Sequence, residues 1–112
     1  MPPDLPRVPA SVRPTSTPGT GADVDLASER ALIDRARMAL ARGQSSAALD
    51  AVDAHAKSYP RGRLVEEREA LAIQALAQAG RTADARARAD KFRATYPNSV
   101  FAGAVDSIAP PR

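Results

Sequence analysis

Apolar residues recur at helical spacing from about residue 26 onward. In the first such segment they stand at i, i+4, i+7 and i+8, which places all four on one face of a helix. These four are Leu32, Ala36, Ala39 and Leu40. Ser28 is of a type that caps helix starts, Glu29 follows it, and Gly43 is of the type that ends helices. The pattern predicts a helix from about Ser28 to Gly43.

The next segment begins just after Gly43, where Ser45 or Ser46 can serve as the helix cap. It must end before Pro60, because the residue in front of a proline disfavours helical backbone. Its inward positions are Ala48, Val52, His55 and Tyr59. Together the two segments predict a helical hairpin over about residues 28–59.

Two further segments repeat this layout. Gly80 ends the third helix, Thr82 caps the fourth, and Pro97 follows the fourth. The inward positions are Val65, Ala72, Ile73 and Leu76 in the third helix, and Ala85, Ala89, Phe92 and Tyr96 in the fourth. We expect a second hairpin over about residues 64–96.

The two hairpins form an internal repeat, in which six pairs of equivalent positions are each separated by 37 residues. The pairs are Gly43 and Gly80, Ala48 and Ala85, Val52 and Ala89, His55 and Phe92, Tyr59 and Tyr96, and Pro60 and Pro97. Periods of about 20 to 50 residues indicate supersecondary units that stack on one another. The sequence therefore predicts an all-α fold with the two hairpins stacked.

The segments on either side of the hairpins differ from each other. Residues 98–109 predict a short capping helix that packs on the fourth helix, with Phe101, Ala104, Val105 and Ile108 on its inward face. Residues 1–25 hold six of the ten prolines and show no apolar periodicity, which predicts a disordered Pro/Ser/Thr-rich linker. The helical domain is then expected over residues 26–109. The linker also contains two PxxP spacings, so a binding motif there stays an alternative to a simple tether.

The turn glycines, the small residues Ala48 and Ala85, and the terminal prolines Pro60 and Pro97 resemble the pattern of the tetratricopeptide repeat (TPR) family. The Tyr-Pro endings are similar to the TPR variant of bacterial cell-envelope lipoproteins. Two features depart from the family: the large aromatic residue that often opens its first helix is missing, and the inter-repeat loop is about three residues longer than in a period of about 34. The resemblance implies an α-solenoid that binds other proteins.

The resemblance also implies where a partner would bind. The inner faces of the first and third helices would form a concave groove. Its residues would be Arg30, Ile33, Arg37, Leu40, Glu67, Ala70, Gln74, Ala77 and Gln78. Their mixed character favours polar anchoring of a peptide or extended segment, with some apolar contact.

Composition narrows the classes of function. The 112 residues carry a net charge of +3 and no cysteine, which excludes a disulfide framework and thiolate chemistry. The longest uncharged stretch, Leu71 to Gly80, is shorter than the roughly 20 apolar residues of a membrane span. No phosphate loop, catalytic serine motif or zinc spacing occurs. We expect no enzymatic activity, no cofactor and no membrane insertion of this segment.

The residues that could carry chemistry have simpler structural interpretations. His55 is the single histidine and takes the place of Phe92, so we expect a partly buried packing residue. A role as ligand or general base is not expected, because no second His, no Cys and no oriented pair of carboxylates accompanies it. The acidic residues Glu66, Glu67 and Glu69 are expected to form a solvated first turn rather than a metal site. In the basic fourth helix, ion pairs of Asp84 with Arg88 and of Arg86 with Asp90 would neutralise much of the positive charge. The cations in question are Arg81, Arg86, Arg88, Lys91 and Arg93.

Three hypotheses of function follow. The first is a non-catalytic protein-interaction module, which the family resemblance places in the periplasm or cell envelope as the soluble part of a longer membrane-anchored protein, with the cytoplasm as the alternative. The second is a structural repeat unit that assembles with copies of itself. The third is a weak nucleic-acid binder that uses the basic fourth helix.

Overall fold

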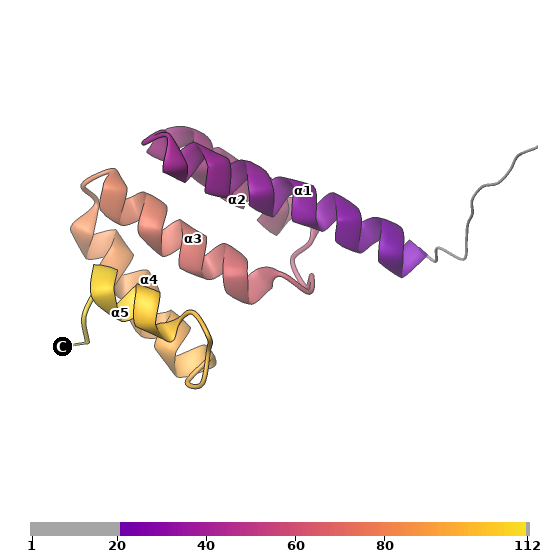
Figure 1. The fold of residues 1–112 in the computed structure, drawn as a ribbon. Coiled ribbons are helices and arrows are strands. Elements are labelled where there is room, and N and C mark those ends of the chain that lie inside the picture. Colours follow the sequence, from indigo (N-terminus) through magenta and orange to yellow (C-terminus); the bar gives the residue numbers. More distant parts are fainter. Residues whose placement is uncertain (1–20, 112) are drawn as a thin grey trace, which may run out of the picture.

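The computed structural model describes residues 21–111 of the chain, and side chains from residue 24 onward. These residues form five helices and no strand (Figure 1). The helices are α1 (Gly21–Ala41), α2 (Ser45–Ser58), α3 (Val65–Gln78), α4 (Thr82–Thr95) and α5 (Ala102–Ile108). The prediction of an all-α fold with two hairpins and a fifth helix is confirmed.

The start of α1 differs from the prediction. The helix begins at Gly21, seven residues before Ser28, so Ser28 lies inside the helix and caps nothing. Acidic Asp25 near this end suits the helix dipole, which favours the longer helix. The last five residues of the linker predicted over residues 1–25 therefore belong to α1. Residues 1–20 lie outside the described part of the chain.

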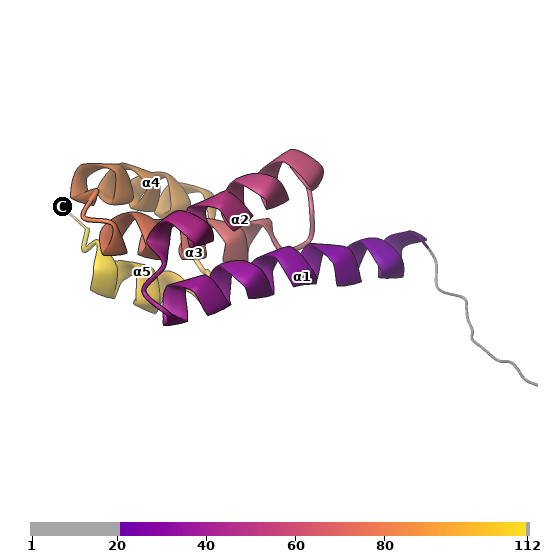
Figure 2. The same cartoon turned by 90° about the horizontal axis from the view of Figure 1, so that it is seen from above.

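The helices pack in two layers. α1 contacts α2, α3 contacts α4, and α2 contacts α3, so the hairpins stand side by side. α3 also contacts both α1 and α5, which places these three helices next to one another. In Figure 2, α2 and α4 lie on the side opposite to α1 and α5. One layer thus contains the first helix of each hairpin together with α5.

Both hairpin turns have the same backbone geometry. Gly43 and Gly80 adopt positive φ angles of 71° and 80°, which residues with a side chain rarely adopt. The amide of Gln44 donates to the Ala39 carbonyl, and the amide of Arg81 donates to the Leu76 carbonyl, which completes a Schellman motif at each turn. Both glycines therefore end their helices as predicted.

The predicted serine and threonine caps are wrong. The residues at the N-cap positions are Gln44 for α2 and Arg81 for α4, and neither side chain forms a capping hydrogen bond. Each Schellman turn leads into the next helix after a single residue, so Ser45 and Thr82 are already the first helical residues. The short turn decides the helix start and leaves no role for a capping side chain.

The repeat extends further into the structure than the six predicted pairs. The amide of Arg68 donates to the Leu64 carbonyl at 2.9 Å, and 37 residues later the amide of Val105 donates to the Phe101 carbonyl at 3.0 Å. The ring of Tyr59 lies 5.6 Å from that of His55, and equivalent rings in the second hairpin lie 5.2 Å apart. α5 is therefore the structural equivalent of the start of α3.

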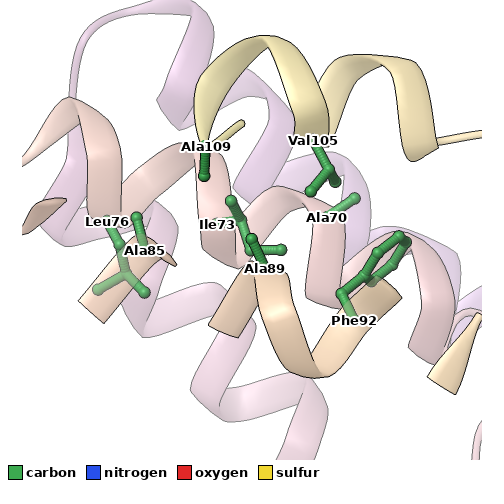
Figure 3. Packing of buried hydrophobic residues seen from close by; sticks show 8 residues of the cluster. All are labelled: Ala70, Ile73, Leu76, Ala85, Ala89, Phe92, Val105 and Ala109. Atoms are coloured by element: carbon green, nitrogen blue, oxygen red, sulfur yellow. The ribbon is translucent and has the colours of Figure 1, made fainter. Parts of the chain in front are cut away.

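The core under α5 differs in detail from the expected capping contact. Val105 and Ala109 are buried in a cluster with residues of both α3 and α4 (Figure 3). The other members are Ala70, Ile73, Leu76, Ala85, Ala89 and Phe92. α5 thus covers α3 as well as α4, begins at Ala102 rather than Asn98, and leaves Ala104 exposed.

The outer faces of the stack are more polar than its internal junction. At the junction, Leu71, Ala72 and Ala75 of α3 pack against the first hairpin. Their equivalents 37 residues earlier, on the outer face of α1, are Asp34, Arg35 and Met38. On the other side, the junction residues Leu49 and Ala51 of α2 correspond to Arg86 and Arg88 of α4.

Candidate functional site

A hollow opens where α1, α3 and α5 meet, and we call it the α1/α3/α5 groove. Its volume is about 610 Å³. The residues that line it are Arg37, Leu40, Ala41, Gln74, Ala77, Gln78 and Ile108. Five of the nine predicted groove residues are among them. The Gln78 side chain also donates to the Leu40 carbonyl at 3.1 Å, which ties the two walls together.

Two lining residues were not predicted, namely Ala41 and Ile108. Ile108 packs against the core as predicted, but it is only half-buried and also lines the groove from α5. The 37-residue register aligns Ile108 with the buried residue Leu71, so it gave no sign that Ile108 would line the groove.

The remaining four predicted residues do not line the groove. Ile33 and Ala70 are 0% and 3% exposed and belong to the core, because α1 and α3 pack closely at this point. Arg30 donates to Glu67 at 3.1 Å, and Arg37 forms an ion pair with the same carboxylate. Arg30 and Glu67 therefore hold α1 against α3 beside the groove.

A second constellation lies at the other end of α1, and we call it the Glu29 latch. The Glu29 side chain is only 3% exposed. Its Oε2 accepts from the Leu64 amide at 2.7 Å and lies 2.9 Å from Nε2 of His55, while its Oε1 accepts from the Arg63 amide at 3.1 Å. One carboxylate of α1 therefore binds both α2 and the residues directly before α3.

This latch corrects the interpretation of His55. The imidazole is indeed interior, at 0% exposure, but it is paired with a carboxylate. The pair was missed because Glu29 was placed in the first turn of a helix starting at Ser28 and no partner was sought for it. The partners are also 26 residues apart in sequence, so no local pattern links them.

Because Gly62 has no side chain, it leaves space for the Glu29 carboxylate. A Cβ atom at this position would lie 2.1 Å from Oε2 of Glu29, which is closer than real Cβ contacts allow. In the second hairpin, the residues equivalent to Glu29 and Gly62 are Glu66 and Ser99, and the Ser99 hydroxyl donates to the Glu66 carboxylate. Both hairpins thus use a glutamate on their first helix to bind the loop after their second.

Replacing Gly62 with alanine is expected to destabilise the fold by about 1–3 kcal/mol, because the new methyl group must displace a buried carboxylate. Gly103→Ala is the matched control, since a Cβ there meets nothing within 4 Å. On an exposed helical site this change should be neutral or stabilising by up to about 1 kcal/mol. Urea denaturation followed by circular dichroism measures both, and equal effects would contradict the role of Gly62.

The latch continues into a chain of charged groups. Arg68 places Nη1 3.4 Å from Nδ1 of His55 and donates through Nε to Glu69 at 3.0 Å. Arg88 of α4 then binds both carboxylate oxygens of Glu69, at 2.8 and 3.0 Å. The chain of contacts runs from α1 through α2 and α3 to α4.

These contacts overturn two predictions about charge. The acidic first turn of α3 is not simply solvated, because Glu67 binds α1, Glu69 binds α4 and Glu66 binds Ser99. The predicted pair of Asp84 with Arg88 does not form, since Asp84 instead pairs with Arg81 at 2.9 Å. Arg88 thus pairs across the hairpin with Glu69, whereas Asp84 pairs with a neighbour at the start of its own helix.

The network shifts the pKa values of three groups. Burial alone raises the pKa of Glu29, but hydrogen bonds from the Leu64 amide and His55 outweigh it, and the pKa lies below its usual value. Burial likewise raises the pKa of Glu69, and the contacts with Arg88 and Arg68 lower it overall. The Glu69 hydrogen bond raises the pKa of Arg88.

The lowered pKa of Glu29 predicts a loss of stability in acid. A carboxyl group with a lower pKa in the folded state adds stability above its usual pKa, here 4.5, and loses it as pH falls through the folded value. The free energy of unfolding should therefore decrease with pH below about 4.5, and less steeply in Glu29→Gln. Urea titrations at several pH values measure both slopes, and identical slopes would contradict the prediction.

Among residues 21–111, no group of three or more His, Cys, Asp or Glu residues is placed to hold a metal ion. In the same range, no helix is both long and apolar enough to cross a membrane. No family model, curated protein or solved structure matches the chain.

Proposed function

We propose that this chain is a non-catalytic protein-interaction module that binds a peptide segment of a partner in the α1/α3/α5 groove. The observation that carries the proposal is the groove itself, which opens on the layer of first helices and has a volume of about 610 Å³. Ligand sites of proteins are commonly concave, largely apolar and supplied with a few polar groups.

The lining favours an extended peptide as the ligand. Leu40, Ala77 and Ile108 offer apolar contacts, and the amides of Gln74 and Gln78 can donate to and accept from a peptide backbone. Arg37 already forms ion pairs with Asp34 and Glu67, so its positive charge is largely neutralised within the protein. A segment with small apolar side chains and little net charge fits these groups best.

The proposed family is a TPR-like one. Support comes from the identical Schellman turns at Gly43 and Gly80 and from the full burial of Ala48 and Ala85 at 0% and 1% exposure. A small residue is what a close helix crossing admits. On the same resemblance we propose that the module is the periplasmic part of a longer envelope protein.

Two features weigh against the other hypotheses. Self-assembly by end-to-end stacking would bring charged residues such as Arg35 and Arg86 into an interface that is apolar inside the chain. In the basic fourth helix, Arg81, Arg88 and Arg93 all pair with carboxylates, which leaves less positive charge for a phosphate backbone.

The test is a selection of peptides from a random display library on the full chain, followed by affinity measurement with the variant Ala77→Arg. Filling the groove should weaken binding at least about tenfold. The matched control is Ala47→Arg, which adds the same side chain at an exposed α2 position lining a different hollow. If no peptide binds, or if both variants bind equally well, the groove is not the site.

A further inference from the structure

A second hollow lies on the outer side of the first hairpin, which forms one end of the stack (Figure 1), and we call it the outer hollow. Its volume is about 530 Å³. Four of its lining residues recur at i, i+4, i+7 and i+11, so they form one stripe along α1 and the turn after it. These four are Ala31, Arg35, Met38 and Arg42. The outer hollow shares no lining residue with the α1/α3/α5 groove.

The internal repeat shows which kind of element fits this position. In the second hairpin, the residues equivalent to Arg35 and Met38 are Ala72 and Ala75, and both are 0% exposed. There the space is filled by α2, which packs on α3 with the small apolar residues Ala48, Ala51 and Val52. These stand at i, i+3 and i+4, on one face of a helix. Met38, by contrast, is 54% exposed, so the equivalent seat on the first hairpin is open.

The charges around the outer hollow differ from those at the internal junction. Asp34 lines the hollow but already forms an ion pair with Arg37. Among residues 21–111, neither Arg35 nor Arg42 forms an ion pair with another side chain. Two positive charges therefore stay available on either side of Met38, about 10 Å apart along the helix axis.

A second copy of this chain does not match these charges. In an end-to-end stack, α4 of one copy would meet the outer hollow of the next. Its exposed residues Arg86 and Lys91 carry the same charge as Arg35 and Arg42, and like charges repel. Charge complementarity therefore points to an acidic occupant from another protein.

We propose that the outer hollow binds an acidic amphipathic helix of a partner protein, which takes the place on the first hairpin that α2 takes on the second. The small apolar residues of the partner helix pack on Ala31 and Met38, whose flexible thioether adapts to an irregular surface. Two of its carboxylates, about two turns apart, pair with Arg35 and Arg42. This site is independent of the peptide site in the α1/α3/α5 groove.

The test uses two synthetic peptides on the full chain, each about 18 residues long and held helical by a side-chain bridge. The acidic peptide carries alanine and leucine on one face and glutamate on both flanks, and the neutral peptide has glutamine in place of each glutamate. Fluorescence anisotropy measures both affinities. We expect the acidic peptide to bind at least about tenfold more tightly at low salt. The difference should shrink at high salt, because ions screen exposed charges.

Two double variants test the role of the arginines. Arg35→Ala with Arg42→Ala should weaken binding of the acidic peptide about three- to tenfold, as expected for the loss of two exposed ion pairs. Lys57→Ala with Lys91→Ala is the matched control, because it removes the same charge from exposed positions outside the hollow and should leave the affinity nearly unchanged. No binding of the acidic peptide, equal binding of the neutral one, or equal losses in the two double variants would overturn the proposal.

Two further variants assign the binding site. Met38→Asp should weaken binding of the acidic peptide at least about tenfold, since it places a like charge at the centre of the contact. Val100→Asp is its control, an 88% exposed residue outside the hollow. Ala77→Arg fills the α1/α3/α5 groove and should leave the acidic peptide bound as before. If only Ala77→Arg weakens binding, the acidic peptide occupies the groove, which supports the groove and rules out the outer hollow.

Discussion

Replacing Glu29 with alanine is expected to lower the free energy of unfolding by about 3–5 kcal/mol, as is typical when one partner of a buried polar pair is removed. The change leaves the His55 imidazole and the Leu64 amide without their buried acceptor, and each uncompensated group is costly. A domain of this size has a total stability of about 5–15 kcal/mol, so the variant should be close to unfolding at ambient temperature.

The matched control is Glu66→Ala, at the equivalent position of the second hairpin. Glu66 is half-buried and accepts a hydrogen bond from the Ser99 hydroxyl, which can bind water instead. We expect a loss of about 1 kcal/mol, the usual net value of one hydrogen bond. Urea denaturation at neutral pH measures both variants. Equal losses would show that the buried latch contributes no more stability than its half-buried equivalent.

The second large effect is expected for Phe92→Ala, at about 3–5 kcal/mol. Phe92 is 2% exposed and is the largest side chain of the cluster that joins α3, α4 and α5. Its removal leaves a cavity that the short helix α5 cannot fill without losing its own contacts. Thermal and urea unfolding should both show the loss, with α5 as the first element to lose amide protection in hydrogen exchange.

Phe101→Ala provides the comparison for this prediction. Phe101 packs against the same cluster but is only half-buried. The apolar area that it removes from water is smaller, so the expected loss is about 1–2 kcal/mol. If Phe101→Ala destabilises the chain more than Phe92→Ala, the edge of α5 contributes more to the fold than the centre of the cluster.

Features set by local chemistry were predictable from the sequence. The turns at Gly43 and Gly80 depend on a positive φ angle, and the end of α2 depends on Pro60, so both could be placed directly. The start of α1 could not, because Gly21 follows a stretch without any apolar repeat. The predicted caps of α2 and α4 were also wrong, because the length of a Schellman turn decides where the next helix begins.

The candidate site was predictable only in part, for a related reason. The TPR resemblance implied that Arg37, Gln74 and Gln78 are groove residues, and all three do line the groove. Ile33 and Ala70 do not, because the closeness of α1 to α3 depends on side chains from both helices. The Glu29 latch joins residues far apart in sequence, and only the packed structure brings them together.

The charged residues on the outer helices have a further consequence for how long such an array can be. Arg86 and Arg88 of α4 stand where α2 has Leu49 and Ala51, and Asp34 and Arg35 of α1 stand where α3 has Leu71 and Ala72. In a concatemer of this chain, the copies are therefore not expected to stack into one array, because charged residues would meet where the junction inside the chain is apolar.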